Sequence, residues 1–325
     1  MKKRKLIMDC GPDPDIAAAL AFAAANQDTL ELLAITTVSS SRSVKKVTRR
    51  TLDLADFFEL KIPVAEGMDA PLVKAPLAEK EIYGDAGPGE CGLSEAVAQP
   101  EEEHAIFYLH TLLSKLTENE KVTFVCCGPL TNMAMLLKLF PETADRIREI
   151  IFAGGAARGG DITASAEAHL YADPEAARIV MDSGIPLIMC GLDAAWKCTL
   201  KRKQITKLCQ SGNRAAKLCG DLMGYRLENT SAKYRGEESL LNVVPWMYLV
   251  HPEIFKVSRT ILSVDCCDGP GRGTSICDFR WWEHEEEEMN AVILTDADEL
   301  KFQEYLISAI YELEEIGRSR KEKGI

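Results

Sequence analysis

The segment Lys5-Leu6-Ile7-Met8-Asp9-Cys10-Gly11-Pro12-Asp13-Pro14-Asp15 joins a short apolar run to an acidic, proline-containing loop. The alanine-rich stretch 16–26 that follows is typical of a buried helix. An apolar strand, a polar loop and a helix in this order begin a β-α-β unit. The segment therefore predicts an α/β fold built on a parallel sheet.

The alternation of strand and helix continues beyond this segment. Continuous apolar strands between helices argue for a parallel sheet that helices cover on both faces. No Pro/Gly/Ser-rich linker or repeat divides residues 1–325, so we expect a single domain. The predicted strands lie at 5–8, 32–38, 62–65, 122–126, 150–153 and 185–190, and the further helices at 44–58, 133–139 and 174–183.

Composition argues against several classes of protein. A formal net charge of −12 argues against a nucleic-acid partner, because binding a polyanion needs a basic face. The residues before Leu6 are too few for a signal peptide, and no apolar run reaches membrane-spanning length. Eleven cysteines without a Cys-x-x-Cys pair argue against structural zinc. We therefore expect a cytoplasmic protein with no nucleic-acid or membrane partner.

Polar residues follow four of the predicted strands. In parallel sheets, ligands bind outside the carboxyl ends of the strands, so these residues should converge on one cleft. Taken alone, each segment is better interpreted as a turn or a helix cap. The segments are 9–15, 39–41, Cys127 and 161–173.

Taken together, these segments resemble the calcium-dependent nucleoside hydrolases. The opening Asp-Thr/Cys-Asp-Pro-Gly-x-Asp-Asp of that family corresponds here to Asp9–Ile16. Its Ile-Thr-Thr-Val, Gly-x-Leu-Thr-Asn and Gly-Leu-Asp segments correspond to 35–38, 128–132 and 191–193. Its Ala-Glu-Phe-Asn-x-x-x-Asp-Pro-Glu-Ala-Ala stretch corresponds to 166–177. The resemblance covers nearly the whole chain and is least clear over 200–240.

The resemblance implies one mixed, mostly parallel sheet flanked by helices, usually in a homodimer or homotetramer. It also implies hydrolysis of the N-glycosidic bond of ribonucleosides. Breaking that bond builds positive charge on the ribose. A calcium ion held by carboxylates can bind the ribose hydroxyls and lower the pKa of a bound water, whose proton an aspartate accepts.

This sequence departs from the family at the residues that should bind calcium. Aligned without gaps, three carboxylate ligands become Gly11, Ile16 and Asn242, and Gly11 also replaces the general base. The backbone carbonyl ligand would come from Cys127. Since calcium affinity follows ligand charge, we expect calcium to bind weakly or not at all.

Other positions differ as well. The family's asparagine after Thr-Thr-Val is Ser41, and the asparagine of its Glu-Phe-Asn is His169. Asp15 and Glu167 match the family, so we predict a substrate site of Asp15, Glu167, His169 and Ser41. The histidine of the family's His-Gly-Glu loop is Tyr83, and its later Thr-His is Ala195-Trp196.

Two residues could compensate for these losses. Asp13 is an acid that the family lacks, and His169 could act as a metal ligand or an acid/base, so both are candidate catalytic residues. A degenerate metal site would comprise Asp9, Asp13, Cys127 and Asn242, with possible oxygens from Asp85 and Asp161. Asp9 and Asp173 also have structural interpretations, as a turn residue and a helix N-cap.

Three functions remain open from the sequence. The chain could be a divergent N-glycosidase, a nucleoside- or ribose-binding protein without turnover, or a partner in a protein assembly. Base selectivity would depend on loops near 76–95 and 220–240. Aromatic residues that could stack on a base, or pack in the core, are Tyr225, Tyr234 and Trp246.

Overall fold

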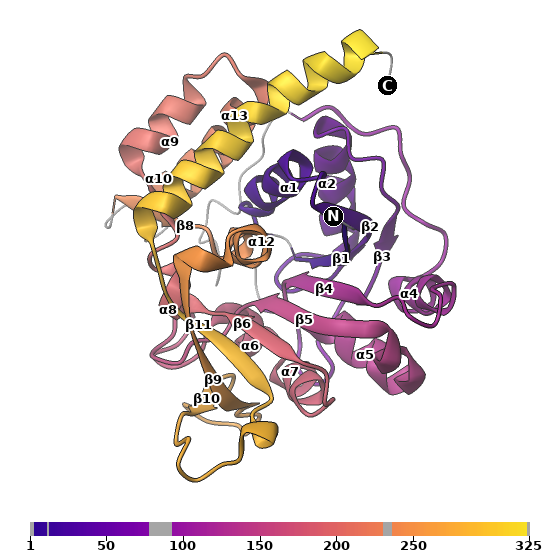
Figure 1. The fold of residues 1–325 in the computed structure, drawn as a ribbon, viewed down its shortest axis with the longest axis vertical. Helices are drawn as coiled ribbons and strands as arrows, with labels where there is room; N and C mark the ends of the chain where they lie inside the picture. Colours follow the sequence, from indigo (N-terminus) through magenta and orange to yellow (C-terminus); the bar gives the residue numbers. More distant parts are fainter. Residues whose placement is uncertain (1–2, 12, 78–92, 230–235, 324–325) are drawn as a thin grey trace.

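The computed structural model describes residues 3–11, 13–77, 93–229 and 236–323, with side chains as far as Leu313. Figure 1 shows a central twisted sheet with helices packed against both of its faces. No helix in this described part of the chain is both long and apolar enough to span a membrane.

Nine strands of the described residues form one sheet, in the order β10-β9-β11-β6-β5-β4-β1-β2-β3. Strands β1 to β6 and β11 are parallel, whereas β9 runs antiparallel to both β10 and β11. The sheet is therefore mixed and mostly parallel, as expected. The strands are β1 Arg4–Cys10, β2 Leu30–Thr37, β3 Val64–Glu66, β4 Val122–Cys127, β5 Ile147–Ala153, β6 Leu187–Cys190, β9 Phe255–Val264, β10 Ser275–Asp278 and β11 Ala291–Ala297.

Helices cover both faces because the strands bury side chains on both sides. In β1, Leu6 and Met8 belong to one apolar cluster and Ile7 to the other. The first cluster contains α1 Ile16–Ala25, α2 Val44–Phe57, α8 Leu192–Ala195, α9 Arg202–Cys209, α10 Arg214–Asn229, α12 Val244–Val250 and α13 Glu299–Lys323. The second contains α4 Ala105–Ser114, α5 Thr131–Leu139, α6 Ala168–Ala172 and α7 Pro174–Met181.

Short elements complete the fold. A separate two-stranded sheet joins β7 Thr199–Lys201 to β8 Glu237–Ser239. Short 3-10 helices lie at η1 Pro141–Arg146, η2 Leu241–Val243, η3 Pro252–Ile254 and η4 Glu286–Glu288. Asn242 lies in η2, which directly precedes α12. Its side chain lies at the carboxyl ends of the central strands, beside Asp13, Asp15 and Cys127.

All of the predicted strands and helices are present, with ends that differ by a few residues. The strand predicted at 5–8 continues to Cys10, so Cys10 pairs with Cys127 and is part of the sheet rather than of the acidic loop. The elements that were not predicted from the sequence include the strands β9, β10 and β11 and the helices α4, α9, α10, α12 and α13.

A glycine turn after β5 positions the loop that leads to α6. Gly155 has a φ of +74°, and its N–H donates to the Glu167 carboxylate at 2.8 Å. A Cβ at Gly155 would lie 2.6 Å from Met189 Sδ. The position therefore requires glycine both for its backbone conformation and for lack of space.

We predict that Gly155→Ala lowers the free energy of unfolding by about 2–4 kcal/mol, because left-handed strain adds to overpacking. Gly184→Ala is the matched control: its φ is +76°, but no described atom lies within 4 Å of the position that the added methyl group would take. The control substitution should lower the free energy of unfolding by only about 1–2 kcal/mol. Urea denaturation of both variants measures the difference, and equal losses would rule out the steric contribution.

Candidate active site

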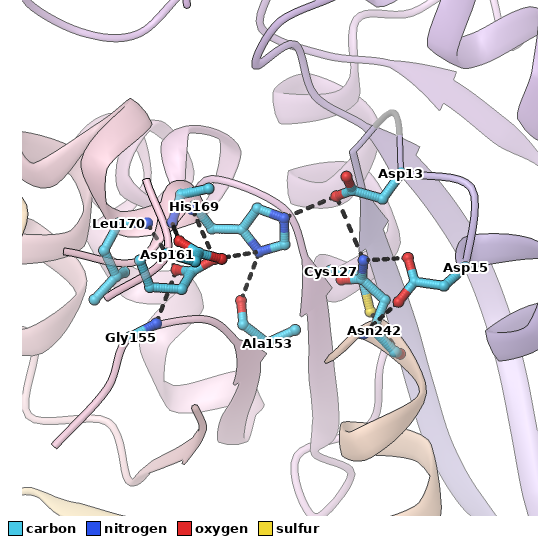
Figure 2. A network of polar contacts seen from close by, with 11 residues as sticks. Asp13, Asp15, Cys127, Ala153, Gly155, Asp161, His169, Leu170 and Asn242 are labelled. Atoms are coloured by element: carbon cyan, nitrogen blue, oxygen red, sulfur yellow. Dashed lines mark hydrogen bonds and ion pairs between the residues drawn. The ribbon is translucent and has the colours of Figure 1, made fainter. Parts of the chain in front are cut away.

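The polar segments that follow the strands meet at one end of the sheet, as the sequence predicted. Asp13 and Asp15 follow β1, Cys127 ends β4, and His169 lies in α6, beyond the end of β5. Asn242 approaches from η2. Figure 2 shows these side chains gathered around a single polar network.

An ion pair between Asp13 and His169 joins the loop after β1 to α6. His169 Nε2 lies 2.8 Å from Asp13 Oδ2, and His169 Nδ1 lies 2.9 Å from the carbonyl oxygen of Ala153. The two side chains are only 8% and 13% exposed for His169 and Asp13. Because both ring nitrogens face oxygen atoms, the doubly protonated imidazolium satisfies both contacts.

The electrostatics of the cleft favour a charged His169. Burial alone would lower the pKa of His169, but the Glu167 charge and the hydrogen bond to Asp13 outweigh it and raise the pKa to about 10. His169 is therefore a cation at neutral pH.

Asn242 links the two aspartates of the loop. Its backbone N–H and its side-chain Nδ2 donate to the two carboxylate oxygens of Asp15, each at 2.9 Å. Nδ2 also lies 3.4 Å from Asp13 Oδ2. Burial and the charge of Asp13 raise the pKa of Asp15, whereas Arg226 opposes the rise. The amide thus binds two acids that would otherwise repel each other.

Glu167 serves chiefly as a structural anchor. It caps α6, accepting from the N–H groups of His169 and Leu170, and it also accepts from Gly155 N–H. Burial raises its pKa to about 7, and the charge of His169 opposes that rise. Asp161 accepts from the N–H of Ala168 at 2.9 Å and so holds the same turn.

The described residues do not fit a calcium ion at the position that the resemblance implies. The Cys127 carbonyl accepts from Gly11 N–H at 2.8 Å, and the Ile16 side chain is 2% exposed within the apolar core. His169 and Asn242 present nitrogens to Asp13 and Asp15, and nitrogens that carry protons cannot bind calcium. Within the described ranges, no group of three or more His, Cys, Asp or Glu residues is arranged to hold a metal.

Asp9 lies apart from this network. Its Oδ1 accepts from Thr36 Oγ1 at 2.6 Å and from Asn132 Nδ2 at 2.7 Å. Burial raises its pKa to about 6, although these two hydrogen bonds oppose the rise. These contacts match the structural interpretation of Asp9 rather than its proposed place beside Asp13 and Asn242 in a metal site.

The other described residues named from the sequence lie outside the network of Asp13, Asp15, His169 and Asn242. Asp173 caps α7 through Ala176 N–H, as predicted. Ser41 Oγ is buried and has no hydrogen-bond partner among the described residues. Trp246 is completely buried and packs in the core, so it cannot stack on a base in the cleft. Tyr83, Asp85, Tyr234 and most of the 76–95 loop lie outside the described residues, and Tyr225 lies on α10.

Sequence reasoning placed Asp13 and Asn242 in one degenerate metal site and named Asp13 and His169 as candidate catalytic residues, but missed that Asp13 contacts both His169 and Asn242. A signal was available. An extra acid at 13, a basic side chain at 169 and a neutral amide at 242 all depart from the family pattern, and their charges are complementary.

The family model described as "Inosine-uridine preferring nucleoside hydrolase" matches residues 6–304. The chain belongs to this family.

Proteins similar in sequence or in fold match most of the length of this chain. It is 33% identical over 279 residues to the pyrimidine-specific ribonucleoside hydrolase RihB of Escherichia coli O157:H7, covering 86% of this chain and 88% of that protein. Its fold superposes on a purine-preferring ribonucleoside hydrolase from Gardnerella vaginalis with a TM-score of 0.86 at 26% identity, over 96% and 100% of the two chains. The plant nucleoside hydrolase PpNRh1 shares the fold, with a TM-score of 0.85 at 23% identity over 95% and 99% of the two chains.

We predict that the contribution of His169 to the free energy of unfolding falls as the pH rises above 6.5. Because its folded-state pKa is raised from 6.5 to about 10, its protonation stabilises the fold fully below pH 6.5, and this contribution is lost as the pH rises toward 10. His169→Gln should therefore be less stable than the wild type at pH 6.5, and the difference should shrink by pH 10.

Denaturation midpoints across this pH range measure the effect. His251→Gln, which removes a histidine 30% exposed at its side chain, is the control for losing a histidine as such. A wild-type advantage over His169→Gln that stays constant from pH 6.5 to 10 would contradict the charged state of His169.

Proposed function

We propose that this member of the family binds a ribonucleoside or ribose in the cleft without calcium, and does not hydrolyse it by the calcium-dependent reaction. The observation that carries the proposal is the buried ion pair between Asp13 and His169. It supplies, from within the chain, the positive charge that a cation would otherwise bring.

Charge balance supports the absence of calcium binding. Calcium takes six to eight oxygen ligands and prefers carboxylates. Here Asp13 is paired with an imidazolium, and both oxygens of Asp15 accept hydrogen bonds from Asn242. A divalent cation would have to displace these donors and lie close to a positive His169, which is costly in a buried site.

In this arrangement, none of Gly11, His169 and Asp13 is placed to accept the proton of an attacking water. General-base catalysis requires an unprotonated group within hydrogen-bond reach of the water. Gly11 has no side chain, and His169 at neutral pH already carries both ring protons. Asp13 is engaged by His169 and by Asn242.

Two buried polar atoms are candidates for binding a sugar. Asn242 Oδ1 and Ser41 Oγ are buried and find no hydrogen-bond partner among the described residues. Ribose hydroxyls can each donate and accept a hydrogen bond, so they suit these atoms. The relatives act on ribonucleosides by their names, which supports this class of ligand.

One observation favours a second candidate, a metal-independent N-ribosyl hydrolase. The protonated His169 is an acid beside Asp13; it would give its Nε2 proton to a nitrogen of the departing base, and the water that adds to the ribose carbon would then return a proton to the neutral imidazole. A pKa near 10 makes this a weak acid, so the binding function is preferred.

Ligand binding and turnover can be measured separately. We expect isothermal titration with inosine, uridine and ribose in EDTA to show one site, with the same affinity when calcium replaces EDTA in the buffer. Asn242→Leu should weaken it at least tenfold, because it removes the unpaired Oδ1. Chromatography of overnight reactions should show no released base.

Three other results would each revise the proposal. Calcium-dependent release of base would overturn it. Release of base in EDTA that His169→Gln abolishes would establish the second candidate. No binding of any of the three ligands would leave assembly with another protein as the function.

Rebuilding the family's residues should restore calcium binding only if the internal ion pair is removed as well. The variant Gly11→Asp/Ile16→Asp/Asn242→Asp recovers three carboxylates but keeps His169. Adding Asp13→Gly and His169→Asn removes both members of the pair. We expect the five-site variant to bind calcium at least tenfold more tightly than the triple variant.

Calcium titration calorimetry compares these two variants directly. A Cβ at Gly11 would lie 3.3 Å from the Cys127 carbonyl oxygen, so both variants share the same local crowding. Equal affinities for calcium would show that His169 does not exclude the ion.

A further inference from the structure

A narrow crevice lies between the loop after β1 and helix α2. Gly11 and Asp13 line it from the loop, and Lys46 lines it from the first turn of α2. Because Asp13 also contacts His169 and Asn242, the crevice shares a wall with the candidate active site. Its volume of about 10 Å³ holds roughly one water molecule, so a larger group would lie across its mouth.

Three basic side chains line this crevice. Arg42 and Arg50 are partly buried, and Lys46 is exposed. Among the described residues that line it, the acid is Asp13, whose charge is already offset by His169. The mouth of the crevice therefore carries an excess of positive charge, in a chain whose formal net charge is −12.

Two acids that contact α2 have donors of their own. Asp69 accepts from the N–H of Val44 at 2.7 Å, and Asp53 accepts from the side chain of Arg49 and from the N–H of Ala96. Neither acid is among the described residues that line the crevice. The three cations of the crevice are therefore not explained as partners of these acids.

The chemistry of these cations suits a phosphate group. Arg42 and Arg50 each have a further interaction, but a guanidinium carries five N–H donors, so one contact leaves donors for a second partner. A phosphate monoester offers three strong acceptor oxygens, whereas a carboxylate offers two. Several charged donors that converge from one helix and the segment before it therefore favour phosphate.

The atoms that we propose for ribose binding lie next to these cations. Ser41, whose Oγ is buried without a partner among the described residues, directly precedes Arg42. Asn242 Oδ1 is also buried without a described partner, and the same side chain contacts Asp13 on the wall of the crevice. A ribose bound by these two atoms would bring its substituents toward the mouth of the crevice.

We propose that the ligand of the cleft is a phosphomonoester of a ribonucleoside, with its phosphate across the mouth of the crevice between Arg42, Lys46 and Arg50. This inference rests on the proposed function, because the bound ribose positions the phosphate. A polynucleotide is disfavoured by the net charge of −12.

Isothermal titration in EDTA compares inosine and uridine with the 2′-, 3′- and 5′-monophosphates of each, and with inorganic phosphate. We expect at least one monophosphate to bind at least tenfold more tightly than its nucleoside, and more tightly than inorganic phosphate, because the sugar and the phosphate both contribute contacts. The gain should fall as the concentration of sodium chloride rises, since salt screens charges at an exposed rim.

Two neighbouring lysines of α2 give a matched pair of variants. Both are exposed, and Lys46 lines the crevice, whereas Lys45 is not among the described residues that line it. Lys46→Glu should lower the ratio of monophosphate affinity to nucleoside affinity at least tenfold. Lys45→Glu makes the same change of charge and should leave this ratio unchanged. Circular dichroism checks that both variants are folded.

Monophosphates that bind no more tightly than their nucleosides would overturn this inference and leave the proposed function standing. A preference for the monophosphate that the two lysine variants reduce equally, or that neither reduces, would overturn it too, because the phosphate would then lie elsewhere. So would inorganic phosphate that binds as tightly as the monophosphates. No binding of any nucleoside or monophosphate would overturn the proposed function, and this inference with it.

Discussion

Asp13 and Asp15 lie two residues apart in one loop, and their nearly buried carboxylates need partners that offset their negative charge. In a buried site, two unpaired negative charges at short range are costly. The protein meets this constraint with the His169 imidazolium and the Asn242 amide, which bring α6 and η2 against the end of β1. The ion pair therefore also fixes how three distant segments of the chain meet.

The surrounding structure supports this arrangement step by step. The glycine turn after β5 orients Glu167, and Glu167 caps α6 and so sets the position of His169. The ring of His169 is held from the other side by the Ala153 carbonyl at the end of β5. Asn242 contacts both aspartates from η2, and α12, which follows η2 directly, packs in the apolar core and holds η2 in place.

Local sequence predicted the parts of the fold whose signal is local. The strand at β1 and the helix at α1 are continuous apolar segments, so pattern alone identified them. Strand β9 alternates irregularly between buried and exposed positions, and its pairing with β11 depends on contacts distant in sequence. The contact between Asp13 and His169 could not be predicted for the same reason. The two residues are 156 positions apart, and their contact depends on the order of the strands in the sheet.

In the proposed function a side chain takes the place of a bound ion, and this would change what can disturb the cleft. A bound calcium ion exchanges with solvent, and its occupancy follows its free concentration. The imidazolium of His169 is covalently part of the chain, so dilution and chelators cannot remove it. Under the proposed function, fluctuations in divalent cations that would empty a calcium site would leave this cleft with the same electrostatics, and the solution variable that alters the charge of His169 would be the concentration of protons.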